Sequence, residues 1–474
     1  MAPPTQVSLI PPEVTVVIQL LVHLGPGVGR AVRAIWQRWK GDPHDHFQHA
    51  LALMKQSRFE EAISLLERCF RRGLSPATTC VLHILVADCL ESIGKFTEAE
   101  KRCREALTDA HKAGNPGLVG GGLVLLGITL LNRSHLTLAE VAMREALSVF
   151  TASGDRDGQA AALGNLGLVY ASRAELGKAD EHYRKALDIH QETNNKLGQA
   201  NDLGNLGTAY AARGDLEEAE EYHKRALEIH QQIGNRFGQA HDLGNLGNMY
   251  LRRGELDKAE EHYRKALEIH QQMGDRLGQA TALGNLGVVY HQRDALEKAT
   301  TYYKKALQID RHIGNRLGQA NHLGNLGLLC AATGNLNKAE KHHKNALAID
   351  EEIGNRLGQA DDLGNLGNVY AQRGELEMAQ EHYDKALAIH QQIGNPLGKA
   401  NTLGNLGLLA LQRGQPDNAR QLFEKARALY EGIGAGGPGP ETVRRALHRL
   451  EAASPPQPKP KRKRARKKPP PKKP

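Results

Sequence analysis

A repeat of forty residues constrains the fold of this chain more than any other feature. The pentapeptide Leu-Gly-Asn-Leu-Gly starts at positions forty residues apart: Leu163, Leu203, Leu243, Leu283, Leu323, Leu363 and Leu403. Weaker copies start near Val81 and Gly121, and a shorter copy covers residues 46–80, so the chain holds about ten units. A fixed period of this length is typical of supersecondary units that stack side by side.

Each unit contains two helical patterns. In the unit that starts at Ala200, a first helix is indicated by residues at helical spacing: Leu203, Leu206, Gly207 and Tyr210. Gly214 interrupts the pattern, and a second helix follows with its own apolar stripe: Leu216, Ala219, Ala226 and Leu227. Gly234 is suited to end that helix, and Asn235 to cap the next one. One helix pair leaves an apolar face that only the next pair can bury, so the sequence predicts an all-α chain, an α-solenoid.

The unit resembles the tetratricopeptide repeat, whose signature is matched by Leu243, Leu246, Gly247, Tyr250, Ala259 and Tyr263. The resemblance spans residues 46–440, and within the family it is most similar to Leu-Gly-Asn repeat adaptors of the Pins type. Each repeat has forty residues instead of the usual 34. The extra residues follow Ala226 and lengthen the second helix and its exit loop. The resemblance implies a right-handed superhelix of about ten helix pairs, whose first helices line a concave groove that binds an extended peptide or a helix of a partner protein.

The ends of the chain differ from the repeats, and four regions are expected. Residues 1–42 form an N-terminal amphipathic helical segment, because Val28, Val32, Ile35, Trp36 and Trp39 share one helix face. That face either caps the first repeat or lies on a membrane surface. Residues 43–440 form the solenoid and residues 441–453 a capping helix. Residues 454–474 are a basic tail of Pro, Lys and Arg, expected to be disordered.

The predicted binding residues are the asparagines of the pentapeptides, here called the asparagine ladder: Asn165, Asn205, Asn245, Asn285, Asn325, Asn365 and Asn405. The resemblance places the ladder on the groove, together with Asn248 and Asn368. An amide offers both donors and an acceptor, so such a ladder can pair with the backbone of an extended peptide. The competing interpretation is that each amide bonds to the adjacent repeat. A clamp for a terminal carboxylate is not expected, since glycine precedes each ladder residue where clamping relatives have lysine.

A second series, the arginine series, lies at the ends of the first helices: Arg173, Arg213, Arg253, Arg293, Arg373 and Arg413. Interaction with the helix C-terminal dipole is one interpretation, and a rim that attracts anions is the other.

Charge is concentrated in the tail. The chain carries a net charge of +9, and its remainder without the tail is close to neutral. The basic run consists of Lys461, Arg462, Lys463, Arg464, Arg466, Lys467 and Lys468. Such a run attracts nucleic acid, anionic lipid or a nuclear import receptor. Because the tail lacks aromatic residues for stacking on bases, nucleic-acid binding through it would be independent of sequence. A role in solubility is the third interpretation.

The remaining features favour a non-enzymatic scaffold or adaptor. Five cysteines form no metal-binding or disulfide pattern, which favours an intracellular, cytoplasmic location, or a nuclear one in a eukaryote. No apolar run is long enough to span a membrane. The segment Gly434–Gly439 matches a nucleotide-binding glycine pattern but lacks the preceding strand. The sequence therefore predicts no catalytic residue, no metal site and no cofactor. Its partner is expected to be a protein, with a tail-dependent association with nucleic acid or an anionic surface as the alternative.

Overall fold

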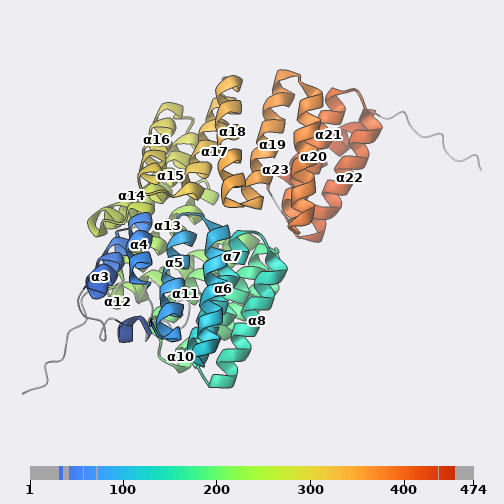
Figure 1. The fold of residues 1–474 in the computed structure, drawn as a ribbon. Coiled ribbons are helices and arrows are strands. Elements are labelled where there is room, and N and C mark those ends of the chain that lie inside the picture. The colour runs from blue at the N-terminus through green and yellow to red at the C-terminus, as the bar shows by residue number, and fades with distance from the viewer. Residues whose placement is uncertain (1–30, 36–41, 57, 71–72, 436, 454–474) are drawn as a thin grey trace, which may run out of the picture.

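The computed structural model describes residues 31–35, 42–56, 58–70, 73–435 and 437–453, and all regular structure in these residues is helical (Figure 1). Ten consecutive pairs run from α3 to α22, and α23 (Pro438–Ala453) follows them. The first helices are α3 (Asp42–Lys55), α5 (Pro76–Ser92), α7 (Pro116–Asn132), α9 (Arg156–Ser172), α11 (Lys196–Arg213), α13 (Arg236–Arg252), α15 (Arg276–Gln292), α17 (Arg316–Ala332), α19 (Arg356–Arg373) and α21 (Pro396–Gln412). The second helices are α4 (Phe59–Cys69), α6 (Phe96–Ala113), α8 (Leu136–Ser153), α10 (Leu176–Glu192), α12 (Leu216–Gln232), α14 (Leu256–Met273), α16 (Leu296–His312), α18 (Leu336–Ile353), α20 (Leu376–Gln392) and α22 (Pro416–Gly432). The prediction of an all-α solenoid of helix pairs is confirmed.

The loop between repeats has the predicted chemistry. Gly234 has a φ of +67°, the left-handed conformation that glycine adopts without strain. One residue later, the Asn235 side chain accepts a hydrogen bond from the backbone N–H of Gly238 at 3.1 Å and caps α13. The same two devices recur from repeat to repeat, so each second helix ends and each first helix begins at a fixed register.

Within a pair, the two helices approach closely at one glycine. A Cβ atom added to Gly247 of α13 would lie 2.6 Å from the ring of Tyr263 on α14, which is fully buried. In the preceding repeat, His223 takes the aromatic position and covers Gly207 in the same way. The Leu-Gly of the repeat is therefore the contact that sets the spacing between the paired helices.

Successive pairs are joined by the arginine series. Arg253 Nη1 lies 2.6 Å from Glu220 Oε2 on α12, and the Tyr250 hydroxyl donates to Glu220 Oε1 at 2.8 Å. Arg173, Arg293 and Arg373 contact Glu140, Glu260 and Glu340 in the same way. Because these four arginines are paired with carboxylates of the preceding second helix, they form inter-repeat links and not the anion-attracting rim considered from the sequence.

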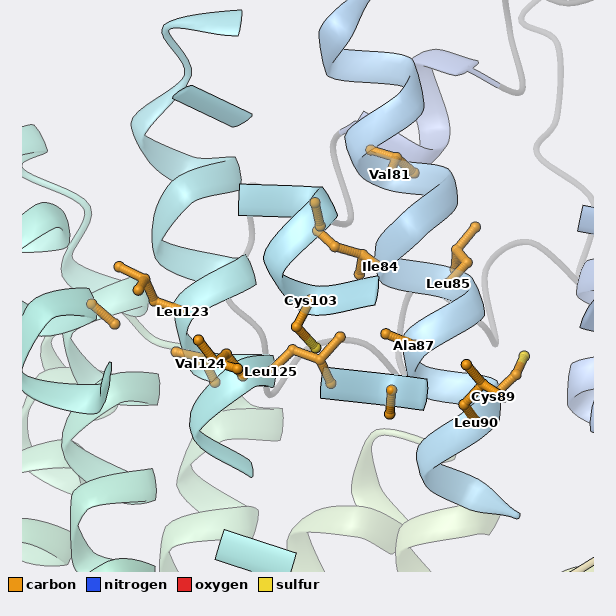
Figure 2. Packing of buried hydrophobic residues seen from close by; sticks show 14 of the residues in the cluster. Val81, Ile84, Leu85, Ala87, Cys89, Leu90, Cys103, Leu123, Val124 and Leu125 are labelled. Atoms are coloured by element: carbon orange, nitrogen blue, oxygen red, sulfur yellow. The ribbon is translucent and has the colours of Figure 1, made fainter. Parts of the chain in front are cut away.

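The hydrophobic core is continuous in the N-terminal repeats. Figure 2 shows side chains of α5 and α7 gathered with Cys103 of α6 in this cluster. Val32 and Ile35 of the predicted N-terminal helix are buried in the same cluster, whereas Val28, Trp36 and Trp39 lie outside the described residues. At the other end, α23 buries three apolar residues next to Phe423 of α22: Val443, Ala446 and Leu447. The basic tail, from Lys461 to Lys468, also lies outside the described residues.

No helix in the described part of the chain is both long and apolar enough to cross a bilayer. All five cysteines are free thiols. Burial raises the pKa of the Cys89 thiol well above its usual value, which disfavours the reactive thiolate.

The solenoid also contacts itself across one superhelical turn, where the N-terminal helices lie beside the middle of the chain (Figure 1). The backbone N–H of Arg316, at the start of α17, donates to the carbonyl of Ile93, just after α5, at 2.9 Å. The Glu60 carboxyl of α4 would lie 2.6 Å from a Cβ atom on Gly314. Ile313 in this loop is 4% exposed, whereas Ile233, its equivalent two repeats earlier, is 40% exposed. The N-terminal repeats therefore cover the loop between α16 and α17.

Replacing Gly247 by Ala should destabilise the fold by roughly 1–3 kcal/mol, because the new methyl group overlaps the Tyr263 ring. Gly244 on the same helix is the matched control, since a Cβ there meets nothing within 4 Å. Gly244→Ala should be neutral or stabilising by up to about 1 kcal/mol. Thermal melts followed by circular dichroism make the comparison. Equal melting temperatures for the two variants would contradict the close-approach role of Gly247.

The contact across the turn can be tested at Ile313. Ile313→Asp places a charge in the buried contact with α4 and should separate the two turns, because an unpaired buried carboxylate is costly. Small-angle scattering should show a larger radius of gyration with unchanged helical content. Ile233→Asp, at the exposed equivalent position, should leave the radius unchanged. An unchanged radius in both variants would show that the contact does not hold the turns together.

Candidate binding groove

A cavity of about 540 Å³ lies on the first helices α9, α11 and α13. Three members of the asparagine ladder line it, Asn165, Asn205 and Asn245. Polar side chains that vary between repeats lie beside them: Asn201, Thr208 and His241. The cavity thus brings together ladder positions and variable positions from three successive repeats, as a groove that selects a ligand by side chain requires.

Four ladder amides have no side-chain hydrogen bond within the described part of the chain: Asn205, Asn285, Asn325 and Asn365. Each of the four is half-buried. A half-buried amide without a partner keeps its donors and its acceptor for water or a ligand. Peptide binding by these four residues stays a prediction.

The other three ladder residues have neighbours. Asn165 donates to the carbonyl of Ala161 in its own helix at 2.9 Å. Asn245 Nδ2 lies 3.4 Å from His241 Nδ1. Asn405 donates to Asn368 Oδ1 of the preceding repeat at 3.3 Å. The competing interpretation, a bond to the adjacent repeat, therefore holds for Asn405.

Tyrosines of the second helices bond to the two further amides that were predicted to lie in the groove, Asn248 and Asn368. The Tyr263 hydroxyl donates to Asn248 Oδ1 at 2.6 Å, and the Tyr383 hydroxyl donates to Asn368 Oδ1 at 2.7 Å. These bonds occupy the amide oxygen. The Nδ2 hydrogens are then the groups that Asn248 can offer to a ligand acceptor.

Buried ionisable pairs underlie the groove between repeats. His190 Nδ1 lies 2.6 Å from Asp202 Oδ2, and His230 Nδ1 lies 2.6 Å from Asp242 Oδ2. All four residues line the cavity. Each pair links the end of one second helix to the next first helix. Burial raises the pKa of Asp202 to about 6, and the hydrogen bond from His190 opposes that shift.

The pair is reversed two junctions further on, between α16 and α17. Asp310 occupies the histidine position and His322 the aspartate position, with His322 Nε2 3.2 Å from Asp310 Oδ2. The order of the two residues changes while their complementarity is kept. Sequence reasoning missed these pairs because it treated the histidines singly. The signal in the sequence was a histidine and an aspartate twelve residues apart, whose order along the chain is reversed at one junction.

One junction carries two carboxyls instead. Asp350 of α18 and Asp362 of α19 are 3% and 5% exposed. Burial raises the pKa of Asp350 to about 7 and that of Asp362 to about 8, and neighbouring carboxyls raise both further. His343 Nδ1 lies 3.5 Å from Asp362 Oδ1, but burial lowers the pKa of His343 to about 4, so this ring is neutral near pH 7. The junction between α18 and α19 therefore lacks the compensating charge that three other junctions have.

Stacked helix pairs with a groove along their first helices define a helical-repeat protein. The tetratricopeptide repeat family model matches residues 122–192, 158–232, 198–272, 238–312, 278–352, 317–392 and 360–432. The chain belongs to the tetratricopeptide repeat family. None of the curated proteins compared with the chain matches it.

The chain is similar to several solved structures, and the first of them shows the shared fold. A Rap protein complexed with Competence and Sporulation Factor has a TM-score of 0.53 and 15% identity, over 74% of this chain and 98% of that one. The Rap conjugation gene regulator of plasmid pLS20, in complex with the Phr* peptide, has a TM-score of 0.48 and 16% identity, over 80% and 96%. A tetratricopeptide repeat protein from Parabacteroides merdae ATCC 43184 has a TM-score of 0.40 and 22% identity, over 61% and 97%.

The carboxyl pair should make stability depend on pH. Folded-state pKa values above the unfolded value mean that the folded chain binds more protons, so stability falls as pH rises from about 4 to about 8. Asp350→His restores the pairing found at His190 and Asp202. It should raise the unfolding free energy by about 2 kcal/mol at about pH 8.5, and by less at about pH 5.

The control for this prediction is the same substitution one junction earlier. Asp310→His removes the partner of His322 and should destabilise the chain at both pH values. Denaturant melts at the two pH values measure the effect. A stabilisation by Asp350→His that is the same at both pH values would contradict the proton-linked explanation.

Proposed function

We propose that the protein is a non-enzymatic scaffold that binds an extended peptide segment or a helix of a partner protein in its groove. The observation that carries the proposal is the row of ladder amides without partners in the described residues, at Asn205, Asn285, Asn325 and Asn365. Membership of the tetratricopeptide repeat family supports it, since this fold typically serves protein interaction.

The dimensions of the repeat suit an extended ligand. Packed neighbouring helices lie about 10 Å apart. An extended chain rises about 3.3 Å per residue, so successive ladder residues would meet about every third residue of a ligand. Backbone N–H and C=O groups of an extended chain have no internal partners, and the ladder amides offer complementary groups. The ladder would then set the register of the ligand, and the variable residues Asn201 and His241 would select its side chains.

The Rap protein that shares the fold was solved with Competence and Sporulation Factor. At 15% identity this likeness concerns the fold. Ligand binding is proposed for this chain on the strength of its own groove. The absence of disulfides among its five cysteines supports an intracellular location for the interaction.

A second candidate function rests on the basic run from Lys461 to Lys468, which suits a nucleic acid or an anionic surface. A chain ending at Ser454 separates the two functions. In a salt titration on duplex DNA, equally weak binding by the full chain and the shortened chain would rule out the tail function.

The groove proposal predicts site-specific capture of a ligand. A photo-crosslinking residue at position 285, in the groove, should capture a polypeptide in cells, and the same residue at the exposed outer position 261 should not. Asn245→Ala combined with Asn325→Ala, the ladder residues on either side of position 285, should weaken that capture about tenfold or more, because two hydrogen bonds of about 1 kcal/mol each are lost. Mass spectrometry of the crosslinks provides the measurement.

Two outcomes contradict the groove proposal. One is equal capture from positions 285 and 261. The other is undiminished capture by a double variant that keeps its helical content, because that result separates binding from the ladder.

A further inference from the structure

We propose that the groove contains an anionic subsite at the junction of α18 and α19, formed by Asp361 and Asp362 and backed by Asp350, that binds the basic side chain of a lysine or arginine in the ligand. This inference rests on the proposed function and names one chemical requirement of its ligand.

Asp361 presents its carboxylate on the inner face of the solenoid. It occupies the position held in other repeats by Asn201, His241, Thr281, Asn321 and Asn401. Asn201 and His241 line the groove cavity at α11 and α13. Like them, Asp361 is exposed. It is the acidic residue in this set.

The place of Asp362 beneath the groove follows from comparison with Asp242 and Gly204, which belong to two earlier repeats. Its Oδ1 atom would be 3.7 Å from a Cβ atom on Gly324, as Asp242 Oδ1 would be 3.8 Å from one on Gly204. Asp242 and Gly204 both line the cavity. Asp362 therefore holds the position equivalent to Asp242 three repeats further along.

Asp362 differs from Asp242 in its partners. Asp242 is paired with His230, whereas Asp362 Oδ2 is buried without a hydrogen-bond partner in the described residues. Its side chain is 7% exposed. A carboxyl oxygen shielded from water and left unpaired is costly unless a proton or a cation compensates it.

The groups that face this carboxyl do not supply a cation. Asp350 is a second carboxyl, and its Oδ1 atom accepts a hydrogen bond from Asn355 Nδ2 at 2.9 Å. His343 is 3.5 Å from Asp362 and neutral near pH 7 because of its burial. Asp361 adds a third carboxyl, close enough to raise the pKa of Asp362. A positive charge placed on Asp361 would favour the ionised forms of Asp350 and Asp362, whose pKa values burial raises to about 7 and about 8.

A side-chain cation fits this wall better than a metal ion. In the described part of the chain, no three histidine, cysteine, aspartate or glutamate side chains are grouped as metal ligands. An ammonium or guanidinium group reaches one exposed carboxylate at the end of a flexible stem, with no need for a closed coordination sphere. The cavity at α9 to α13 does not oppose a basic ligand, because neither lysine nor arginine lines it.

The repeats themselves provide the test variant. Asp350→His restores the pairing of His190 with Asp202, and Asp361→Asn restores the residue found at Asn201, Asn321 and Asn401. The double variant carries side chains that this fold already accommodates at equivalent positions. It should keep its helical content while losing the anionic subsite.

The probes are two blocked pentapeptides, Ala-Ala-Lys-Ala-Ala and the same sequence with norleucine in place of lysine. Ligand-observed saturation-transfer NMR with the full chain should show tenfold or stronger preference for the lysine peptide, and the double variant should lose that preference. In the reverse experiment, His190→Asp with Asn201→Asp should strengthen lysine binding at the junction of α10 and α11.

A full chain without a preference for lysine overturns the subsite, whether it binds both peptides or neither. So does a double variant that retains the preference. The groove proposal is judged separately, by crosslinking from position 285. If the chain shows no preference for lysine but still crosslinks from position 285, only the subsite is refuted. If it prefers lysine but does not crosslink from position 285, only the groove proposal is refuted.

Discussion

The close approach of two helices at a single glycine determines how the repeats from α7 to α22 are built. Gly247 lies directly under the Tyr263 ring, so α13 and α14 pack as one unit with an apolar face on each side. A helix pair of this kind cannot bury both faces by itself. Each face therefore needs a neighbour, and the chain satisfies that need by repeating the pair until α23 covers the last one.

Polar contacts decide which neighbours fit. Arg253 and Tyr250 converge on Glu220 of the preceding second helix, and the buried pair of His230 and Asp242 links the same two repeats closer to the groove. Near-identical repeats would stack in any register if apolar contact were the whole interaction. Reversal of the pair at Asp310 and His322 keeps the charge balance but changes its direction, so the junctions are chemically distinct although the backbone repeats.

The sequence was sufficient to predict the fold because its signals are local and repeated. The helix ends at Gly234 and Asn235, the aromatic position of His223 and the Leu-Gly contact all follow from residue type and spacing. The sequence could not predict which ladder amides have hydrogen-bond partners. Asn405 bonds to Asn368 of the preceding repeat, whereas Asn365 makes no such bond to the repeat before it. The difference depends on which residue lies three positions after the ladder residue of the preceding repeat. The carboxyl pair of Asp350 and Asp362 was missed because its members come from two different repeats.

The contact between the loop after α5 and the start of α17 has a consequence for how a ligand reaches the groove. The backbone bond from Arg316 to Ile93 and the burial of Ile313 close one side of the superhelical turn. Under the proposed function, a long polypeptide with bulky domains at both ends would not enter the groove across this contact. Such a ligand would either thread a free terminus along the axis or bind after the contact between Ile93 and Arg316 opens. In the second case, the association rate would depend on how often that contact opens.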